Sequence, residues 1–390
     1  MCFLKQSYVY PKMKLKLILI FFLFSLAIPA SAITETDKKF NASSQDTSIQ
    51  IIDSTLQKVW EINNDTTASY QLVLSDNKIF SPLDDGLIYC YDFNGKEKWV
   101  AEIFGDIQNN LVHYKDLILT STSSGDLYSI NANNGDVVQV MGIGESITSN
   151  LALIDLANAD TKSKGIVFGT ESGTIYCYDI FSFERIWEIK LSRFPITANP
   201  LSIDDKIFFR DSLSTVYSVG TKSGSLIWEH EFAKNESEKN NSQIISDGNR
   251  VFILSPTQEL AALDVLLGKV LWSTKKLDIY SQVQLSNDKN YLIALNKKGS
   301  LMLFSSTDGK EIKRIDLAKE NINSFYYDDS ESYSLLVLSD GSISLVDDKY
   351  EIRPILKLNN EIIKTLKTLP KNQFLISTQS GKLLLFRFEQ

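Results

Sequence analysis

The chain repeats one short segment at a near-constant spacing, and no other feature of the sequence limits the possible folds as strongly. Its clearest copies are 86–92 (Gly-Leu-Ile-Tyr-Cys-Tyr-Asp), 125–131 and 173–179. Successive copies begin at Gly86, Gly125, Gly173, Ser214, Gln258, Gly299, Gly341 and Gly381, at spacings of 39, 48, 41, 44, 41, 42 and 40 residues. A period near 40 residues that contains only β-strand signals is typical of β-propeller blades.

Each repeat contains four short runs that have the composition of β-strands. An inner run such as 71–74 opens the repeat, and an apolar run such as 165–169 precedes the glycine segment. A further run, as in 267–272, follows a second turn. Runs rich in β-branched and aromatic residues and bounded by Gly, Asn, Asp and Ser indicate strands. No helical period interrupts them. The sequence therefore predicts an all-β fold of four-stranded antiparallel blades.

The two ends of the repeat region complement each other. The last repeat runs only to Phe388 and lacks a fourth strand, whereas 55–62 has the pattern of a fourth strand and precedes the first complete repeat. Placing this N-terminal strand in the last blade closes the ring and removes open strand edges. We therefore expect residues 51–390 to form a single eight-bladed β-propeller.

All five tryptophans occupy one position of the repeat. Trp99, Trp228 and Trp272 each lie four residues after the glycine of the turn between the third and fourth strands. Trp187 has the same place after Phe183, and Trp60 has it in the closing strand. A large aromatic side chain repeated on an outer strand can cover the seam between neighbouring blades. We assign these residues a structural role in the blade seams rather than a ligand site.

The N-terminal region has the pattern of a secretory signal. A positive stretch with Lys12, Lys14 and Lys16 precedes an apolar run over 17–28, and Pro29 leads to Ala-Ser-Ala at 30–32. Small residues at this spacing are typical of a signal cleavage site. The apolar run is about a dozen residues long, shorter than the roughly 20 that span a bilayer. A cleavable signal is favoured over the alternative, an uncleaved anchor.

We place the signal peptide at 1–32, with the true start at either Met1 or Met13. Residues 33–50 are polar and charged without periodicity, which predicts a disordered tether. Cleavage removes four lysines and no acidic residue, so the formal net charge of −8 becomes more negative. An acidic protein is a poor ligand for nucleic acids and for anionic membranes. We expect no nucleic-acid partner and no direct membrane insertion.

The side chains that could carry catalysis are few and scattered. His113 and His230 are the only histidines, they are not at metal-ligand spacing, and the sequence contains no Gly-x-Ser-x-Gly motif. Cys90 and Cys177 share a repeat position with Ser129, so we interpret them as buried small residues. The sequence therefore predicts a non-enzymatic protein without catalytic, metal-binding or cofactor-binding residues.

The segments 173–179 and 258–272 resemble the pyrroloquinoline-quinone-type propeller repeat. With eight repeats, an N-terminal closing strand and export, the region from Leu56 to Phe388 is most similar to the BamB family of outer-membrane assembly factors. The resemblance implies a periplasmic scaffold of the β-barrel assembly machinery, monomeric within a complex, that binds the periplasmic domains of the barrel-assembly protein. Members are commonly lipoproteins, but no cysteine follows Ala32. This chain would then be held at the outer membrane only through its partner.

The resemblance also suggests which residues contact the partner. The family uses a Leu-Arg element leading into the fourth blade and acidic residues leading into the fifth. Here Leu191 and Arg193 lead into the fourth blade, and Glu236 and Glu238 precede the fifth. In a four-stranded antiparallel blade, these connections lie on the same face as the turns between second and third strands, and we expect the partner there.

Two other functions remain open at this point. Quinone-dependent dehydrogenases share the blade motif, but they are larger and have calcium ligands and often a Cys-Cys pair, which this chain lacks. An exported propeller that binds another envelope ligand or protein is the main alternative. Charged residues in the outer strands, as at 96–98, 184–185 and 310–313, oppose pairing with another strand, so we predict that client strands do not add to the blade rims.

Overall fold

The computed structural model describes residues 49–389 except 69, 76, 157–162, 234–242, 276, 318–324, 330–333 and 348. The expected signal peptide and all but the last two residues of the expected tether therefore lie outside the described residues. Asp46–Gln390 form one compact unit. Within the described ranges, no helix has the length and apolar character needed to cross a membrane.

The described chain forms eight small antiparallel sheets, which we number as blades in chain order. Blade 1 contains β3 (Val73–Ser75), β4 (Lys78–Pro82), β5 (Leu87–Asp92) and β6 (Glu97–Glu102). Blade 2 contains β7 (Val112–Tyr114), β8 (Leu117–Ser121), β9 (Asp126–Asn131) and β10 (Val137–Gly142). Blade 3 contains β11 (Ala152–Asp155), β12 (Lys164–Gly169), β13 (Thr174–Asp179) and β14 (Arg185–Lys190). Blade 4 contains β15 (Leu201–Ile203), β16 (Lys206–Arg210), β17 (Val216–Gly220) and β18 (Leu226–His230).

The remaining blades follow the same order from the inner to the outer strand. Blade 5 contains β19 (Ile245–Ser246), β20 (Arg250–Leu254), β21 (Leu260–Asp264) and β22 (Val270–Thr274). Blade 6 contains β23 (Ile279–Leu285), β24 (Tyr291–Asn296), β25 (Ser300–Ser305) and β26 (Glu311–Asp316). Blade 7 contains β27 (Phe325–Asp329), β28 (Ser334–Leu338), β29 (Ser342–Val346), β30 (Ile352–Leu358) and β1 (Ile49–Ile51). Blade 8 contains β31 (Ile363–Leu369), β32 (Gln373–Thr378), β33 (Lys382–Phe388) and β2 (Leu56–Asn63).

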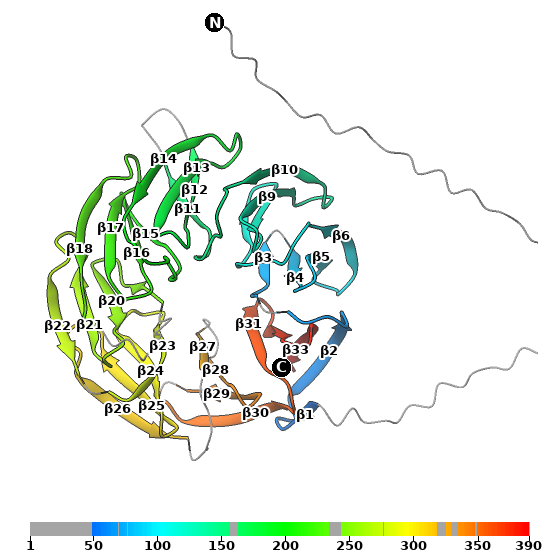
Figure 1. Ribbon diagram of the computed structural model, residues 1–390. Helices are drawn as coiled ribbons and strands as arrows, with labels where there is room; N and C mark the ends of the chain where they lie inside the picture. Colours follow the sequence, from blue (N-terminus) through cyan, green and yellow to red (C-terminus); the bar gives the residue numbers. More distant parts are fainter. Residues whose placement is uncertain are drawn as a thin grey trace, which may run out of the picture. The chain divides into compact units, whose positions relative to one another are not determined.

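These sheets are arranged in a ring, which confirms the predicted eight-bladed propeller (Figure 1). The second and third strands of each blade carry most of the buried side chains, among them Phe80, Phe168, Phe208, Phe252 and Phe304. Alternate side chains of a strand point to opposite faces of a sheet. Because a neighbouring blade covers each face, these central strands are apolar at nearly every position.

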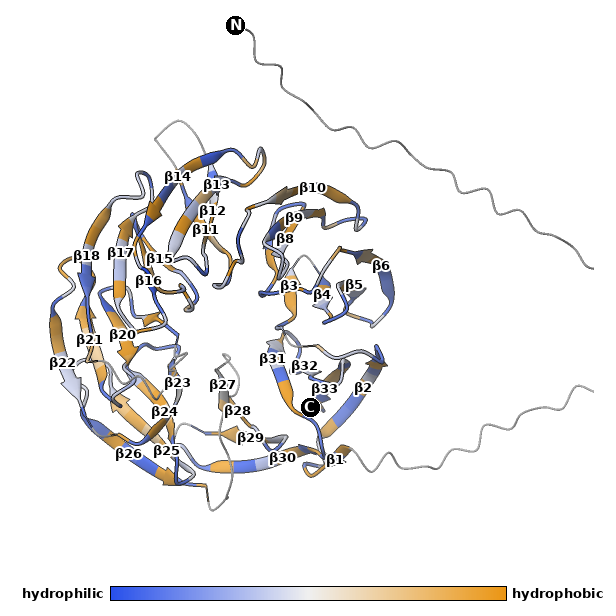
Figure 2. Ribbon diagram, viewed as in Figure 1, coloured by the Kyte–Doolittle hydropathy of each residue, from blue (hydrophilic) through white to orange (hydrophobic). Residues whose placement is uncertain are grey.

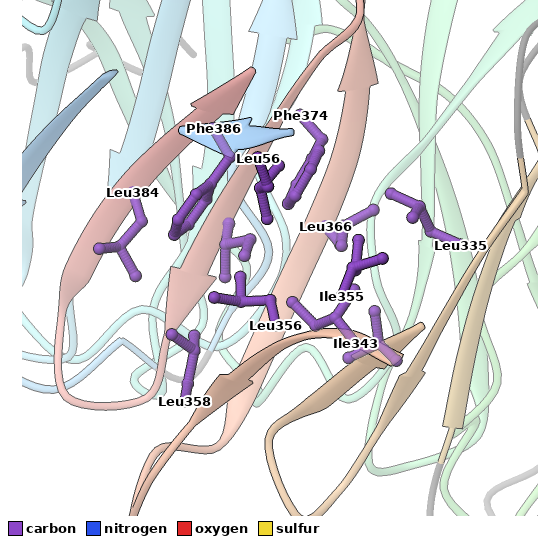
Figure 3. Packing of buried hydrophobic residues seen from close by; sticks show 12 residues of the cluster. Leu56, Leu335, Ile343, Ile355, Leu356, Leu358, Leu366, Phe374, Leu384 and Phe386 are labelled. Carbon is purple, nitrogen blue, oxygen red and sulfur yellow. The ribbon is translucent and has the colours of Figure 1, made fainter. Parts of the chain in front are cut away.

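The N-terminal strand closes the ring as predicted. β2 pairs antiparallel with β33, from Leu56 opposite Phe388 to Asn63 opposite Lys382. Leu56 lies beside Phe374 and Phe386 of the same blade and joins a buried cluster with side chains of blade 7, including Ile355 (Figure 3). The ring therefore closes through both strand pairing and an apolar core shared by blades 7 and 8.

One strand was not expected from the sequence. Ile49–Ile51, partly within the predicted tether, forms β1 and pairs antiparallel with β30, so that blade 7 has five strands. The following turn is held by Asp53, whose carboxylate accepts hydrogen bonds from the Thr55 amide and hydroxyl at 2.9 and 2.8 Å. Arg353 of β30 forms an ion pair with Asp53 at 2.6 Å.

Every tryptophan lies at a seam between two blades. Each indole packs against the glycine of the turn between the third and fourth strands in the next blade; these glycines are Gly95, Gly135, Gly224, Gly268 and Gly309. Each indole N–H also donates to a carbonyl oxygen of that next blade. The donors Trp60, Trp99, Trp187, Trp228 and Trp272 reach Phe93, Ala132, Thr221, Val265 and Ser306 at 3.1, 3.2, 2.8, 3.1 and 3.1 Å.

The two cysteines of the propeller are buried free thiols in different blades. Burial raises the pKa of Cys90 to about 11 and that of Cys177 to about 12. Both thiols therefore stay protonated at neutral pH and behave as small apolar side chains. His113 also has a packing role, because its ring stacks on Phe80 with centroids 5.6 Å apart.

Candidate partner-binding face

The connections between blades lie on one face of the ring, together with the turns between second and third strands. The first residues after the fourth strand donate N–H groups to the carbonyl oxygen of that turn's glycine. Ile103 reaches Gly86 at 3.0 Å, and Leu191 reaches Gly173 at 3.2 Å. We call this surface the connection face; it is the face on which the sequence placed the partner.

The connection from blade 3 to blade 4 holds Arg193 in an exposed position. Leu191 is half-buried and packs on a core cluster, while Ser192 is buried. The Ser192 hydroxyl donates to Asp211 Oδ2 at 2.7 Å and accepts the Phe194 N–H at 3.1 Å. The backbone on both sides of Arg193 is therefore fixed, while its side chain is exposed and can meet another surface.

Asp211 is the buried centre of this connection. One carboxylate oxygen accepts the N–H groups of Leu213 and Thr215, each at 3.0 Å. The other accepts the Tyr217 hydroxyl at 3.0 Å as well as Ser192. Burial, together with the nearby Asp211 charge, raises the pKa of Tyr217 to about 12, so its hydroxyl remains a donor at neutral pH. The carboxylate is thus held by several donors, as a buried charge requires.

Arg210 is the other buried charge beside this connection. Its side chain is fully buried at the end of β16. Burial lowers its pKa to about 10, and the Asp211 charge acts in the opposite direction. Arg210 therefore remains a cation at neutral pH, and the charge of Asp211 favours this charged form.

A hollow of about 320 Å³ opens beside Arg193. Lys190 and Arg193 supply cations to its wall, and Glu229 and Glu231 supply acidic groups. Phe194 adds an apolar surface and is 41% exposed. The hollow therefore offers charges of both signs beside an exposed aromatic ring, which suits a polar protein surface with a few anchoring side chains.

The structure brings together only some of the residues singled out from the sequence. Leu191 and Arg193 lie in one connection and line the hollow. Glu236 and Glu238 lie outside the described residues. Sequence reasoning missed Glu229 and Glu231, which line the hollow just before those positions. Their alternation at the end of β18 was a usable signal, because every second residue of a strand lies on one face.

Several polar side chains around the hollow are hydrogen-bonded to one another. Among the described residues, no three His, Cys, Asp or Glu side chains gather as metal ligands would. The polar groups of the connection are engaged in mutual hydrogen bonds around Asp211. The hollow can bind another molecule through its charges, its hydrogen-bonding groups and the aromatic surface of Phe194.

A family model described as outer membrane protein assembly factor BamB matches residues 45–202 and 171–332, which is most of the chain. The chain belongs to the BamB family. The BamB proteins of Shewanella oneidensis and Yersinia pestis are 21% identical over 252 residues and 18% identical over 259 residues. These alignments cover 62% and 64% of this chain and the same shares of the two relatives, so the match spans less than two thirds of the relatives' length.

Solved structures resemble this BamB-family propeller over most of its length. BamB from Moraxella catarrhalis has a TM-score of 0.67 at 16% identity, and the match covers 86% of this chain and 98% of that one. Sqt1 from Saccharomyces cerevisiae has a TM-score of 0.69 at 11% identity, with coverages of 85% and 99%. A computationally designed protein, Ika8, has a TM-score of 0.67 at 15% identity, with coverages of 85% and 99%. Because such different proteins share it, the fold alone does not define a function.

Proposed function

We propose that this BamB-family chain is a non-enzymatic scaffold of outer-membrane β-barrel assembly and binds the periplasmic domains of the barrel-assembly protein. Family membership supports the assembly role. The main structural support for the binding site is the hollow beside Arg193, which has charges of both signs and lies on a rigid connection between blades 3 and 4. The scaffold acts as a monomeric propeller in the periplasm, and the partner alone holds it at the outer membrane.

The proposed contact uses Arg193 as its central anchor. An arginine can bind a partner carboxylate through two parallel hydrogen bonds. Phe194 covers the apolar part of the partner, and Glu229 and Glu231 receive a cation. Since the Ser192–Asp211 hydrogen bond fixes the connection in advance, little conformational entropy is lost on binding. Glu236 and Glu238 belong to the same proposal as acidic contacts ahead of blade 5.

Calorimetry with the periplasmic domains of the organism's barrel-assembly protein tests this proposal. Reversing the charge in Arg193→Glu removes an anchor worth about 2 kcal/mol, so the Kd is expected to rise roughly thirtyfold. Arg185→Glu is the matched control, because Arg185 is an exposed cation on β14 of the same blade that pairs with Glu188 at 2.5 Å. This control is expected to bind like the wild type.

Two outcomes would contradict the proposal. Absence of binding by the wild-type protein removes the barrel-assembly protein as partner and directs attention to other envelope ligands. Equal weakening of binding by Arg193→Glu and Arg185→Glu would show that the connection face is not the site.

Export is tested separately by mass spectrometry of periplasmic protein, for which a chain beginning at Ile33 is expected.

A further inference from the structure

The fourth strand of each blade lies at the rim of the ring and, except for β30, is the outermost strand of its sheet. Most of these strands carry charged residues, which discourage pairing with another chain. β6, β14 and β26 have three or more each, β2 and β30 have two each, and β18 has Glu229. Among the eight fourth strands of the described chain, only β10 and β22 contain no charged residue. β1, which covers β30 and is the outermost strand of blade 7, is uncharged too but has only three residues.

The chain itself demonstrates that such an edge accepts a further strand. β1 adds to the outer edge of β30, with Ile49 opposite Leu358 and Ile51 opposite Leu356. This pairing forms although β30 contains Arg353 and Lys357. Charged residues in the outer strand therefore do not by themselves prevent pairing in this fold, and an outer strand without them opposes it less.

β10 combines an uncharged edge with exposed side chains that favour strands. Val137, Val138 and Val140 are 42%, 57% and 47% exposed, and the apolar colour of β10 is visible at the rim (Figure 2). Gln139 points the other way and donates to the carbonyl oxygen of Ser182 in blade 3 at 3.3 Å. Met141 packs against the buried cluster shared with blade 3. The side chains of Gln139 and Met141 thus hold β10 to blade 3, whereas the side chains of Val138 and Val140, which we call the valine row, are exposed.

Of the two uncharged fourth strands, β22 is less suited than β10 to pair with an added strand. It has five residues, and its second half is Ser273 and Thr274, whereas β10 has six residues with valine at three exposed positions. β-branched residues pair well across neighbouring strands. A strand added to β10 would place alternate side chains beside Val138 and Val140.

We propose that β10 binds an extended segment of a partner protein, with alternating apolar and polar residues, as a fifth strand of blade 2. Main-chain hydrogen bonds to the free edge supply affinity, and the valine row selects apolar side chains at alternate positions. This goes beyond the proposed scaffold function, since it uses the rim and not the connection face. Its failure leaves the binding at Arg193 untouched, and the reverse also holds.

A fluorescein-labelled peptide of about ten residues, in which valine alternates with threonine and lysine, tests the edge by fluorescence anisotropy. The double variant Val138→Lys/Val140→Lys places two cations beside the added strand. We expect it to weaken peptide binding by about tenfold or more, as edge lysines do in natural sheets. Val100→Lys is the control, because Val100 is 40% exposed on β6, whose edge already carries charges. It is expected to bind like the wild type.

Hydrogen exchange on the wild-type protein provides a second readout that needs no variant. Bound peptide is expected to slow amide exchange within 137–142 and to leave the connection at 190–194 unchanged. The proposal is overturned if the wild type does not bind the peptide, if protection appears elsewhere, or if Val100→Lys weakens binding equally. A concentration-dependent dimer of the wild type that the double variant abolishes would also overturn it, since the occupant would then be a second copy.

Discussion

The indole of Trp228 lies directly over the backbone of Gly268 in the next blade. A Cβ atom at Gly268 would stand 2.5 Å from the ring, far closer than packed atoms approach. Gly268 also has a φ of +67°, in the left-handed region that favours glycine. This glycine therefore permits both the turn and the close contact of the tryptophan.

Comparing Gly268→Ala with Gly144→Ala separates the cost of the left-handed backbone from the cost of the indole contact. A non-glycine residue in the left-handed region costs about 1 kcal/mol, and displacing the indole adds about 1–3 kcal/mol by overpacking. Gly144→Ala serves as control, because Gly144 has a φ of +88° and an added Cβ would meet no atom within 4 Å. Urea denaturation is expected to show a clearly lower midpoint for Gly268→Ala. Equal midpoints would mean that the indole contact contributes nothing.

At the residue scale, the sequence predicted the position of a side chain within the repeat but not the atoms of the neighbouring blade that it contacts. The offset of four residues from the turn glycine is enough to place Trp228 on an outer strand. Its hydrogen bond to the Val265 carbonyl crosses between blades, and local patterns do not encode such contacts. Likewise, Arg193 could be named from the sequence, but its support by Ser192 and Asp211 depends on a bond across 19 residues.

At the scale of strands, the seam between blades 2 and 3 differs from the five tryptophan seams in both partners. Gln139 takes the place of the tryptophan on β10, since it pairs with Ser129 as Trp99 pairs with Cys90. Phe183 takes the place of the glycine in the facing turn and is buried at a φ of +54°. The two changes fit together, because a phenylalanine leaves no bare backbone for an indole to cover.

A double-mutant cycle tests this pairing. Gln139→Trp alone is expected to destabilise the protein by about 1–3 kcal/mol, because the indole meets Phe183. In a Phe183→Gly background the same change is expected to cost at least about 1 kcal/mol less, since the indole regains its glycine. The four midpoints are measured by urea denaturation. Additive effects would show that the two positions are independent.

The element that the sequence did not predict, β1, depends on a carboxylate. The amide and hydroxyl of Thr55, followed by the Arg353 charge, hold the pKa of Asp53 below its ordinary value. β1 has only three residues, so its pairing derives from β30 and this turn rather than from local preference. The repeat period revealed strands as short as β3, β7 and β15, but β1 precedes the first repeat, so the period gives no signal for it.

Asp53→Asn probes this anchor through pH. A lowered folded-state pKa means that the carboxylate stabilises the fold above about pH 4 and that this contribution is lost as pH falls through the folded value. At pH 7 we expect the variant to be less stable than the wild type by about 1–2 kcal/mol. Below the folded pKa the two proteins are expected to converge, as checked by urea midpoints at several pH values. A pH-independent difference would contradict the role of the charge.

At the scale of the whole molecule, the ring is joined by strands distant in sequence. β2 and β33 come from opposite ends of the propeller, and their pairing completes blade 8. The last described residue, Glu389, lies beside the start of β2, and its N–H donates to the Thr55 carbonyl oxygen at 2.7 Å (Figure 1). The repeat count and the missing fourth strand made this closure predictable, because adding the isolated first strand to the incomplete last repeat gives blade 8 its four strands and covers the edge of β33.

Two truncations distinguish the closing strand from its neighbour β1. A chain that begins at Asp53 loses β1 but keeps β2, so the ring remains closed, and we expect a soluble monomer with a lower urea midpoint. A chain that begins at Asn64 loses β2 as well and uncovers the edge of β33, together with Phe374 and Phe386. An uncovered apolar edge promotes association, so this chain is expected to aggregate in sedimentation velocity. If it instead remains a monomer with an unchanged midpoint, ring closure by β2 is not what holds blade 8 in place.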